Sequence, residues 1–390
     1  MAAEGAQAMI REAMSLLQRG DARGAMAQLD LALQQFPADA DVRLNRAMVL
    51  RAAGKLPAAL IELDAALAID PYFFLALLSK GAVLERMNQR GAAALVYRDA
   101  IKIAPAPEAL PPALQTPLAH ARTVVEDDAR QLAEFLQQHT AELRGSHAAE
   151  NLERFDESLQ ILAGRKRVYH AEPVQLHVPQ LPAIPFFDRS HFPWLPQLEA
   201  ATGMIREELL ALIDAGMPGF APYISYPPGA PLNQWAELNN NREWSSFWLW
   251  KDGARQEGAI ARCPRTAALL ATLPMADQEG FAPTALFSAL APHTRIPPHT
   301  GSTNARLLVH LPLILPGPAG FRVGNAERQW RMGEAWCFDD SIEHEAWNGA
   351  DQTRVILIFD IWNPLLSQAE RELLSALMRA RKSWYGSPGA

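Results

Sequence analysis

Two histidines, His299 and His310, lie eleven positions apart in the stretch "PPHTGSTNARLLVHLPL", and a third, His344, ends the acidic run "CFDDSIEH". Neutral imidazole is the commonest side-chain ligand of transition metals in proteins. Eleven residues of straight strand would span more than about 30 Å. His299 and His310 can therefore share one pocket only if the chain turns between them, and "TGSTN" supplies such a turn.

Arg354 lies early in the apolar segment "TRVILIFDIW", on a face that is expected to be buried. An unpaired charge in a protein interior costs several kcal/mol, so a buried arginine needs a partner. Asp360 shares this face but is about 20 Å away along a strand. A carboxylate of a ligand is the simplest partner, because the guanidinium group binds a planar carboxylate through two parallel hydrogen bonds.

Histidines on separate strands followed by this arginine describe a small β-barrel that binds a divalent metal and a dicarboxylate. Non-haem Fe(II) oxygenases fit this description. A single histidine on a strand is more often a core residue that holds no metal, and only the combination with Arg354 favours a metal site.

The elements that must position these side chains are short strands separated by turn residues. Strand-like segments are "TALFSALAP", "ARLLVHLPLIL", "GFRVGN", "RQWRM", "EAWCFDD", "HEAWNG" and "TRVILIFDIW". This spacing predicts an antiparallel sandwich or barrel. Alternation in the last segment places Arg354, Ile356, Ile358 and Asp360 on one face. One helix is expected in "PQLEAATGMIREELLALIDAG", and Ser367 with Glu370 forms a capping-box pattern that opens a final helix.

The first hundred residues contain an internal repeat. Pro37, Pro71 and Pro105 recur every 34 residues, and small residues keep the same spacing: Ala25, Ala59 and Ala93, then Ala32, Ala66 and Ala100, together with Gly20 and Gly54. This period is typical of tetratricopeptide repeats, which stack helical hairpins into a solenoid. An Ala-rich helical bundle is the weaker alternative. A helix from about Leu118 to Arg144 is expected to cap the repeats. We predict repeats at 1–110, a helical cap and connection at 111–165, and a β-rich domain at 166–390.

Composition narrows the partners and the location. The chain has 390 residues and a formal net charge of −7, which gives no general attraction to nucleic acid or to anionic membranes. Only two cysteines are present, Cys263 and Cys337, and no run of 18 apolar residues occurs. We expect a cytoplasmic protein without disulfides that does not enter a membrane.

Several long motifs in order resemble the aspartyl/asparaginyl β-hydroxylases, a family of Fe(II)- and 2-oxoglutarate-dependent dioxygenases. These motifs are "EWSSFWLWKDG", "CPRTAALLATLP", "PHTGSTNARLLVHL", "FDDSIEHEAW" and "RVILIFDIWNP", and the resemblance covers roughly residues 180 to 375. It implies a double-stranded β-helix of the jelly-roll or cupin type, and hence a multidomain α + β chain that begins with an α-solenoid. Animal members also join tetratricopeptide-like repeats to the hydroxylase.

The resemblance implies that His299 and His344 are the catalytic iron ligands. Most 2-oxoglutarate oxygenases add a carboxylate two positions after the first histidine, where this chain has Gly301. The family leaves that place to water. The alternative is a carboxylate from Asp339, Asp340, Glu343 or Glu345. If an anionic ligand is missing, a Gly301→Asp substitution is expected to increase iron affinity.

The resemblance also implies that Ser288 and Arg354 bind the remote carboxylate of 2-oxoglutarate, with His310 beside this cosubstrate. One departure from the family is Leu308, at a position that is basic in the animal enzymes. Arg306 could replace that basic residue, or it could be a surface residue on an edge.

For the substrate cleft, the resemblance points to Trp244, Arg242 and Arg265, although packing or solvent exposure would explain them equally well. Trp336, Trp347 and Trp362 are expected to lie in the core.

The predicted activity is O₂-dependent hydroxylation of a C–H bond, most simply the β-carbon of Asp or Asn in a peptide or protein presented by the repeats. A free amino acid or a lipid-linked acyl chain is the alternative substrate. A repeat scaffold with an inactive barrel is the non-enzymatic alternative, and the presence of His299, His344, Ser288 and Arg354 together argues against it. A concave helical surface favours the extended peptide.

Overall fold

The computed structural model describes residues 2–386, and the chain divides into two compact units, Met1–Arg167 and Val168–Ala390. The finer boundaries near residues 110 and 165 stay predictions. Within the described residues, no helix combines the length and the apolar composition that crossing a membrane requires.

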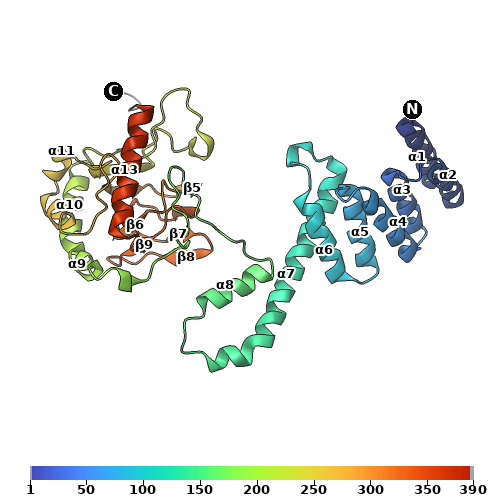
Figure 1. The fold of residues 1–390 in the computed structure, drawn as a ribbon, viewed down its shortest axis with the longest axis horizontal. Helices are drawn as coiled ribbons and strands as arrows, with labels where there is room; N and C mark the ends of the chain where they lie inside the picture. The colour runs from blue at the N-terminus through green and yellow to red at the C-terminus, as the bar shows by residue number, and fades with distance from the viewer. Residues whose placement is uncertain (1, 387–390) are drawn as a thin grey trace. The chain divides into compact units, whose positions relative to one another are not determined.

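The first unit is helical throughout (Figure 1). Its helices are α1 (Ala2–Gln18), α2 (Ala22–Gln35), α3 (Ala40–Ala52), α4 (Leu56–Ile69), α5 (Phe74–Arg86), α6 (Arg90–Lys102), α7 (Pro112–Ser146) and α8 (Glu153–Leu162), with a 3-10 turn at Pro107–Ala109.

Helices α1 to α6 form three hairpins with the predicted period, so the tetratricopeptide repeats are confirmed. The small residues at the repeated positions are completely buried between the helices of each hairpin, where a larger side chain would clash: Ala25, Ala59, Ala93, Ala32, Ala66 and Ala100. Gly20 and Gly54 have φ of 84° and 72° in the hairpin turns. In the third turn Asn88 takes the place of the glycine, with φ 59°. Asparagine tolerates this left-handed conformation better than most side chains.

Helix α7 is longer than the predicted helix, since it begins at Pro112, and proline is favoured in a first helical turn. Its residues Ala121, Val124 and Val125 pack against the third repeat. They cover the apolar face that the last hairpin would otherwise expose.

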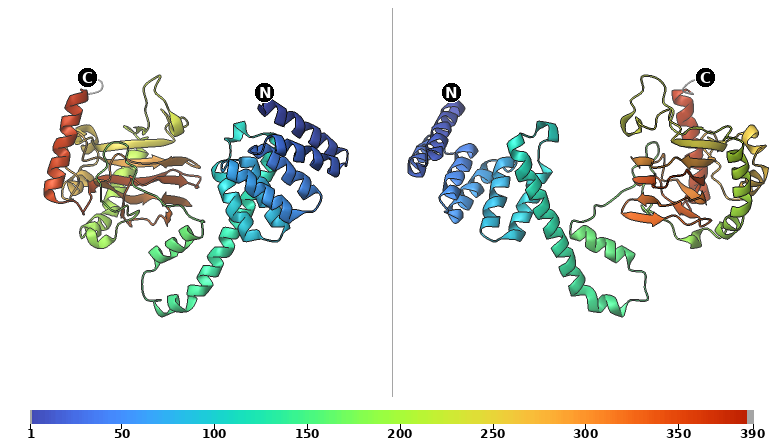
Figure 2. Two further views of the ribbon diagram at one scale, coloured as in Figure 1. Left: turned by 45° about the vertical axis from the view of Figure 1, so that its right-hand side comes forward. Right: turned by 180° about the vertical axis from the view of Figure 1, so that it is seen from behind.

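The second unit contains two antiparallel sheets (Figure 2). The strands are β1 (Ala221–Pro222), β2 (Trp244–Lys251), β3 (Ala254–Arg255), β4 (Ala285–Leu290), β5 (Arg295–His299), β6 (Arg306–Ile314), β7 (Ala319–Val323), β8 (Ala326–Gln329), β9 (Trp336–Phe338), β10 (His344–Asn348) and β11 (Arg354–Trp362). The larger sheet has the order β1-β2-β4-β11-β6-β9, with β3 beside β2, and the smaller has the order β5-β10-β7-β8.

The helices of this unit differ from the sequence prediction at one place. The single helix predicted around "PQLEAATGMIREELL" is two helices, α9 (Leu195–Ala200) and α10 (Thr202–Asp214), separated at Ala201. The Thr202 hydroxyl donates to the carbonyl of Glu199, which satisfies an acceptor at the end of α9. The other helices are α11 (Glu257–Ile260), α12 (Pro264–Leu270) and α13 (Gln368–Tyr385), with 3-10 turns at Arg189–His191 and Asn233–Trp235. The predicted Ser367–Glu370 capping box opens α13.

The larger sheet is buried on both faces. Val355, Leu357 and Phe359 of β11 face a core that contains α9, α10 and α12. Ile356 and Ile358 face the opposite way, into a second core shared with Phe321 and Val323 of the smaller sheet. The space between the two sheets is therefore the place toward which Arg354, two residues before Ile356, is directed.

Candidate metal and carboxylate site

His299 and His344 are brought together by the smaller sheet. They are register partners on the antiparallel strands β5 and β10, and their ring centroids are 4.1 Å apart. Both side chains face the inner core, His344 beside Phe321 and Phe338 and His299 beside Trp235. Two residues that are far apart in sequence thus form one pair of imidazoles.

Each ring is held in one orientation by its own strand. The Nδ1 of His299 lies 2.7 Å from the carbonyl of Pro297, and that of His344 lies 3.0 Å from the carbonyl of Ile342. A carbonyl only accepts, so each Nδ1 carries the proton and Nε2 keeps its lone pair. Burial lowers the pKa of His299 and, more strongly, that of His344, so both rings stay neutral. A neutral imidazole whose second nitrogen donates to a carbonyl is the form that binds a metal.

No third protein ligand completes the pair within the described residues, where no group of three or more His, Cys, Asp or Glu side chains has metal-binding geometry. Three of the alternative carboxylates are engaged elsewhere: Asp339 accepts from Ser341, Glu343 pairs with Arg322, and Glu345 pairs with Arg322 and Arg295.

Asp340 differs from the other three, because its carboxylate lies against Gly301. A Cβ atom added to Gly301 would overlap the Asp340 carboxylate. Burial and the neighbouring Asp339 raise the pKa of Asp340 to about 8. The space that an aspartate at position 301 would need is therefore already filled by a carboxylate from another loop. An aspartate at position 301 would therefore first have to displace the Asp340 carboxylate, and the expected gain in iron affinity of Gly301→Asp stays a prediction.

A methyl group at position 301 tests this packing. Gly301→Ala is expected to lower the free energy of unfolding by about 1–3 kcal/mol through overpacking, and adding Asp340→Ala is expected to restore most of it. Thermal melting of the three variants checks this. Gly203→Ala is the matched control, since a Cβ atom there meets nothing within 4 Å. If Gly301→Asp alone retained parental stability and bound iron more tightly, Asp340 could not occupy this space.

Arg354 lies at the other end of the inner core. It is 1% exposed, and its Nε and Nη1 atoms have no hydrogen-bond partner. The guanidinium lies 5.1 Å from the ring centroid of Trp330, which also stacks with His310. Burial lowers the pKa of Arg354 to about 10, so it stays charged at neutral pH. The structure thus contains the buried, unpaired cation that the sequence predicted.

Further buried polar atoms without partners lie in the same unit, and two of them, in Trp330 and His310, are next to this cation. They include Nδ1 of His310, Nε1 of Trp330, Nε1 of Trp336 and Oγ of Ser246. Ser288 lies in register with Ser246, and its hydroxyl accepts a hydrogen bond of 3.1 Å from Nε1 of Trp244, which leaves its proton free to donate. Buried polar groups are normally hydrogen-bonded, so several unpaired ones together indicate a site for a polar ligand. The charge of Arg354 makes that ligand an anion.

Trp244 and Arg306 differ in their relation to this site. Trp244 lines it, since it contacts His299 and Ser288. Arg306 pairs with Asp360 and donates to the carbonyl of Phe281, so it does not replace the missing basic residue at Leu308, which is half-buried on the inner face.

The other two predicted substrate residues lie in different parts of the unit. Arg265 belongs to the helical layer, where it pairs with Glu207 and Glu208, so the structure does not bring it to the site. Arg242 is exposed in the turn before β2.

Two contributors were missed by sequence reasoning, Trp330 and Ser246. Trp336 was expected only as a core residue, yet its indole N–H is unpaired. For Ser246, the signal was available: a serine in the apolar strand "EWSSFWLW" whose register partner is Ser288. Trp330 follows β8 directly, and its place beside Arg354 depends on how the two sheets face each other.

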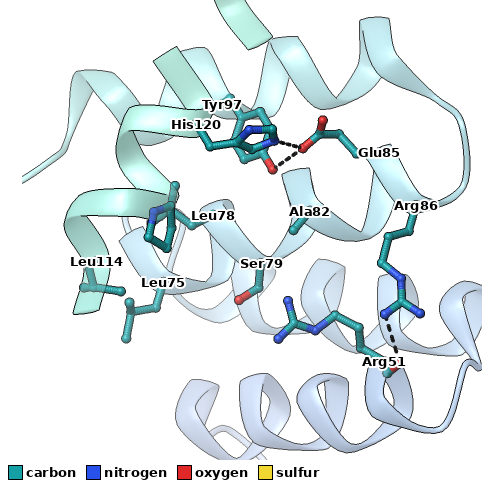
Figure 3. Close-up of a pocket in the computed structure, with 11 residues that line it drawn as sticks. Arg51, Leu75, Leu78, Ser79, Ala82, Glu85, Arg86, Tyr97, Leu114 and His120 are labelled. Atoms are coloured by element: carbon teal, nitrogen blue, oxygen red, sulfur yellow. Dashed lines mark hydrogen bonds and ion pairs between the residues drawn. The ribbon is translucent and has the colours of Figure 1, made fainter. Parts of the chain in front are cut away.

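The helical unit contains a separate cavity of about 580 Å³ between α3, α5 and α7 (Figure 3). Leu75, Leu78 and Leu114 line one part of it, whereas Arg51 of α3 and Arg86 of α5 approach each other in another part. The carboxylate of Glu85 accepts a hydrogen bond from the Tyr97 hydroxyl and lies 2.8 Å from Nε2 of His120. It therefore already has partners within the helical unit. The cavity therefore combines an apolar surface with an excess of positive charge.

Comparisons with known proteins identify a family. Residues 199–364 match the sequence model of the family described as aspartyl/asparaginyl beta-hydroxylase. The chain is 35% identical to the human aspartyl/asparaginyl beta-hydroxylase over 182 residues, 46% of this chain and 22% of the human protein. It is 34% identical to the ornithine lipid ester-linked acyl 2-hydroxylase of Rhizobium tropici over 204 residues, 51% of this chain and 68% of that protein.

Among solved structures, the tetratricopeptide domain of Sgt2 from Aspergillus fumigatus covers 32% of this chain and 82% of its own, at 21% identity and a TM-score of 0.29. The chain spans about a fifth of the length of the human and mouse hydroxylases that it matches.

Proposed function

Because this chain belongs to the aspartyl/asparaginyl β-hydroxylase family, we propose that it is an Fe(II)- and 2-oxoglutarate-dependent dioxygenase on a double-stranded β-helix. The substrate that we propose is an Asp or Asn side chain of a peptide or protein. The observation that carries the proposal is the inner core itself, which contains the neutral imidazole pair of His299 and His344 and also a buried, unpaired guanidinium, Arg354, with His310 beside it. A metal ion would be bound by the two imidazoles, and a dianionic ligand would pair with the guanidinium.

In this proposal, Nε2 of His299 and Nε2 of His344 hold the iron, and their Nδ1–H groups keep the rings oriented. Arg354 and Ser288 bind the remote carboxylate of 2-oxoglutarate. The unpaired donors Trp330 and Trp336 are available for the same anion. The bound metal and cosubstrate would supply the oxygen chemistry needed to hydroxylate an unactivated C–H bond. The chain contributes orientation of both partners and an interior from which bulk water is excluded.

Succinate release tests this function. With Fe(II), 2-oxoglutarate and O₂ present, a library of Asp- and Asn-containing peptides is expected to include members that accelerate succinate formation and gain 16 Da. Absence of 2-oxoglutarate binding under anaerobic conditions with Fe(II) would exclude the dioxygenase.

A lipid-linked acyl chain is the second candidate substrate. The bacterial relative named as an ornithine lipid acyl 2-hydroxylase matches a larger share of its own length than the human relative does. A fatty-acyl ornithine lipid belongs in the same succinate assay. Mass spectrometry of the lipid and of the peptides identifies which one acquires oxygen.

We place recognition of a peptide substrate in the cavity of the helical unit. Within the described residues Arg51 has no carboxylate partner, and Arg86 donates only to the carbonyl of Arg51. An acidic segment flanked by leucines would match both the cations and the apolar wall.

Arg51→Ala is expected to weaken binding of such a peptide by about tenfold, which corresponds to 1.4 kcal/mol. Fluorescence anisotropy of a labelled peptide with an Asp-Glu pair between leucines measures this without iron or cosubstrate. Arg23→Ala, an exposed arginine of α2 outside the cavity, is the matched control. Equal affinity of the Arg51→Ala variant and the parent would exclude this cavity as the acidic-peptide site.

A further inference from the structure

Helix α13 has apolar residues on two opposite faces. On its inner face, Met378 is buried and Leu374 packs with Ala276 and Ala305. On its outer face, Leu373, Leu377 and Trp384 are 70%, 54% and 82% exposed. Figure 2 shows α13 at the periphery of its unit, with one side turned away from the strands.

The exposed residues of α13 form one continuous stripe. At about 100° per residue, Leu373, Leu377 and Trp384 fall on the same side as three exposed alanines. We call this set the outer stripe; its members are Ala369, Leu373, Ala376, Leu377, Ala380 and Trp384. A helix that packs by one face normally presents polar residues on the other, so a second apolar face indicates a second contact. The helix also lies beyond the residues that match the family, 199–364.

Charged residues flank the outer stripe in an ordered way. Glu370 and Arg381 lie along one flank, and Glu372 and Arg379 lie along the other. On both flanks the acid belongs to the first half of the helix and the base to the second half. The acids have partners within their own helix: one oxygen of Glu370 accepts from Ser367 in the capping box, and one oxygen of Glu372 accepts from Gln368. Arg379 has one contact of 3.9 Å to the exposed Glu279, and Arg381 lies over the ring of Tyr385.

This order of charges is self-complementary in an antiparallel helix pair. Around a two-fold axis, each flank of one helix meets the same flank of its copy, with the first half against the second half. An axis between residues 375 and 376 places Glu370 opposite Arg381 of the second copy. The same axis also places Glu372 opposite Arg379, so one symmetry operation satisfies both flanks.

The apolar residues follow the same axis. Leu373 faces Leu377 of the second copy near the centre. At each end, Trp384 reaches the level of Leu365, which precedes the partner helix and is 43% exposed. A parallel pair would instead place like charges side by side along both flanks, which is destabilising. Charge and shape thus favour one orientation and one register.

We propose that the outer stripe of α13 is a homodimer interface, in which α13 packs antiparallel against α13 of a second copy of this chain. An 18-residue helix is only about 27 Å long, so the buried area is smaller than the roughly 1,600 Å² of a standard interface. The dimer is therefore weak, with a dissociation constant on the order of micromolar.

Sedimentation velocity of the full chain over a range from about 1 to about 100 µM tests the proposal. The parent is expected to change from monomer to dimer across this range. In Glu372→Arg, the new arginine lies opposite Arg379 of the second copy. In Arg379→Glu, the new glutamate lies opposite Glu372 of the second copy. Each single variant is expected to raise the dissociation constant at least tenfold. The double variant Glu372→Arg/Arg379→Glu recreates the opposite charges and is expected to restore the dimer.

Glu142→Arg makes the same charge change on an exposed position of α7 and is expected to leave dimerisation unchanged. Thermal melting confirms that the surface variants fold. A parent that stays monomeric, a dimer indifferent to Glu372→Arg, or a double variant that fails to restore pairing overturns the proposal. Cosedimentation of the parent with phosphatidylglycerol vesicles, lost in Leu373→Ser/Leu377→Ser, would assign the outer stripe to a lipid surface and would also overturn it.

Discussion

Replacing Arg354 by methionine is expected to stabilise the ligand-free protein while it abolishes cosubstrate binding. The folded state holds this guanidinium buried, with two of its nitrogens unpaired. Burial lowers its pKa from the ordinary value of a guanidinium to about 10, a cost to folding on the order of 3 kcal/mol. Methionine has similar length, no charge and no need for a partner. The melting temperature should rise by about 2–4 °C for each kcal/mol recovered.

The pH dependence of this gain follows from the sign of the shift. A basic group whose pKa is lower in the folded than in the unfolded state destabilises the folded protein at every pH at which it is charged. For Arg354 this is the range below about pH 10. The cost declines only as the pH rises from that value toward the unfolded pKa. The gain from Arg354→Met is therefore expected to be constant between about pH 6 and about pH 9.

Ligand-induced stabilisation gives the second measurement on this variant. At a concentration a hundred times its dissociation constant, 2-oxoglutarate should stabilise the parent by about 2.7 kcal/mol, and the Arg354→Met variant should show no shift.

Arg306→Met is the matched control for Arg354→Met. Arg306 is also largely buried but is paired with Asp360, so its removal orphans a carboxylate and is expected to lower stability by about 3–5 kcal/mol. A lower melting temperature for Arg354→Met, or retained stabilisation by 2-oxoglutarate, would contradict the role assigned to Arg354.

Removing either imidazole is expected to reduce iron binding and succinate release together. Loss of a residue that merely orients a metal ligand typically costs 10–100-fold, so loss of His299 or His344 itself should leave less than about one-hundredth of the parental turnover. In the described part of the chain no group of three or more His, Cys, Asp or Glu side chains forms a metal site, so no third such ligand is in place to compensate. Anaerobic Fe(II) titration and succinate release in His299→Ala and His344→Ala measure both quantities.

His293→Ala is the control for these variants. His293 is exposed, lies in the turn before β5 and pairs with the exposed Asp351. It should retain iron binding and turnover. If His344→Ala kept parental turnover while its melting temperature showed that it was folded, the assigned metal site would be wrong.

Features that depend on neighbours along the chain could be predicted from the sequence. The 34-residue period, the capping box of Ser367 and Glu370, and the shared face of Arg354 and Ile356 are all local. Helix and strand geometry converts such spacing directly into position. The resemblance to known hydroxylases added His299 and His344 as a pair, because ordered motifs carry information that periodicity lacks.

Features that depend on neighbours across strands needed the tertiary structure. Trp330 meets Arg354, and Asp340 fills the space beside Gly301, although neither contact has a signal in local spacing. Asp360 is likewise the partner of Arg306 on the adjacent strand. Alternation assigns a residue to a face, but sheet order and register decide which residues share that face.

The sequence by itself therefore determined the repeats, the family to which this chain belongs and most of the strands, but not β2 or β5, the strand that carries His299. Only the tertiary structure decided that the imidazoles of His299 and His344 are neutral and are oriented by the carbonyls of Pro297 and Ile342. It also decided that Arg354 is buried in the same inner core without a hydrogen-bond partner for Nε and Nη1. It also revealed the outer stripe of α13 as an exposed face, because exposure depends on what the rest of the fold covers. Protonation, unmet hydrogen bonds and exposure all arise from packing, which no single segment of a chain contains.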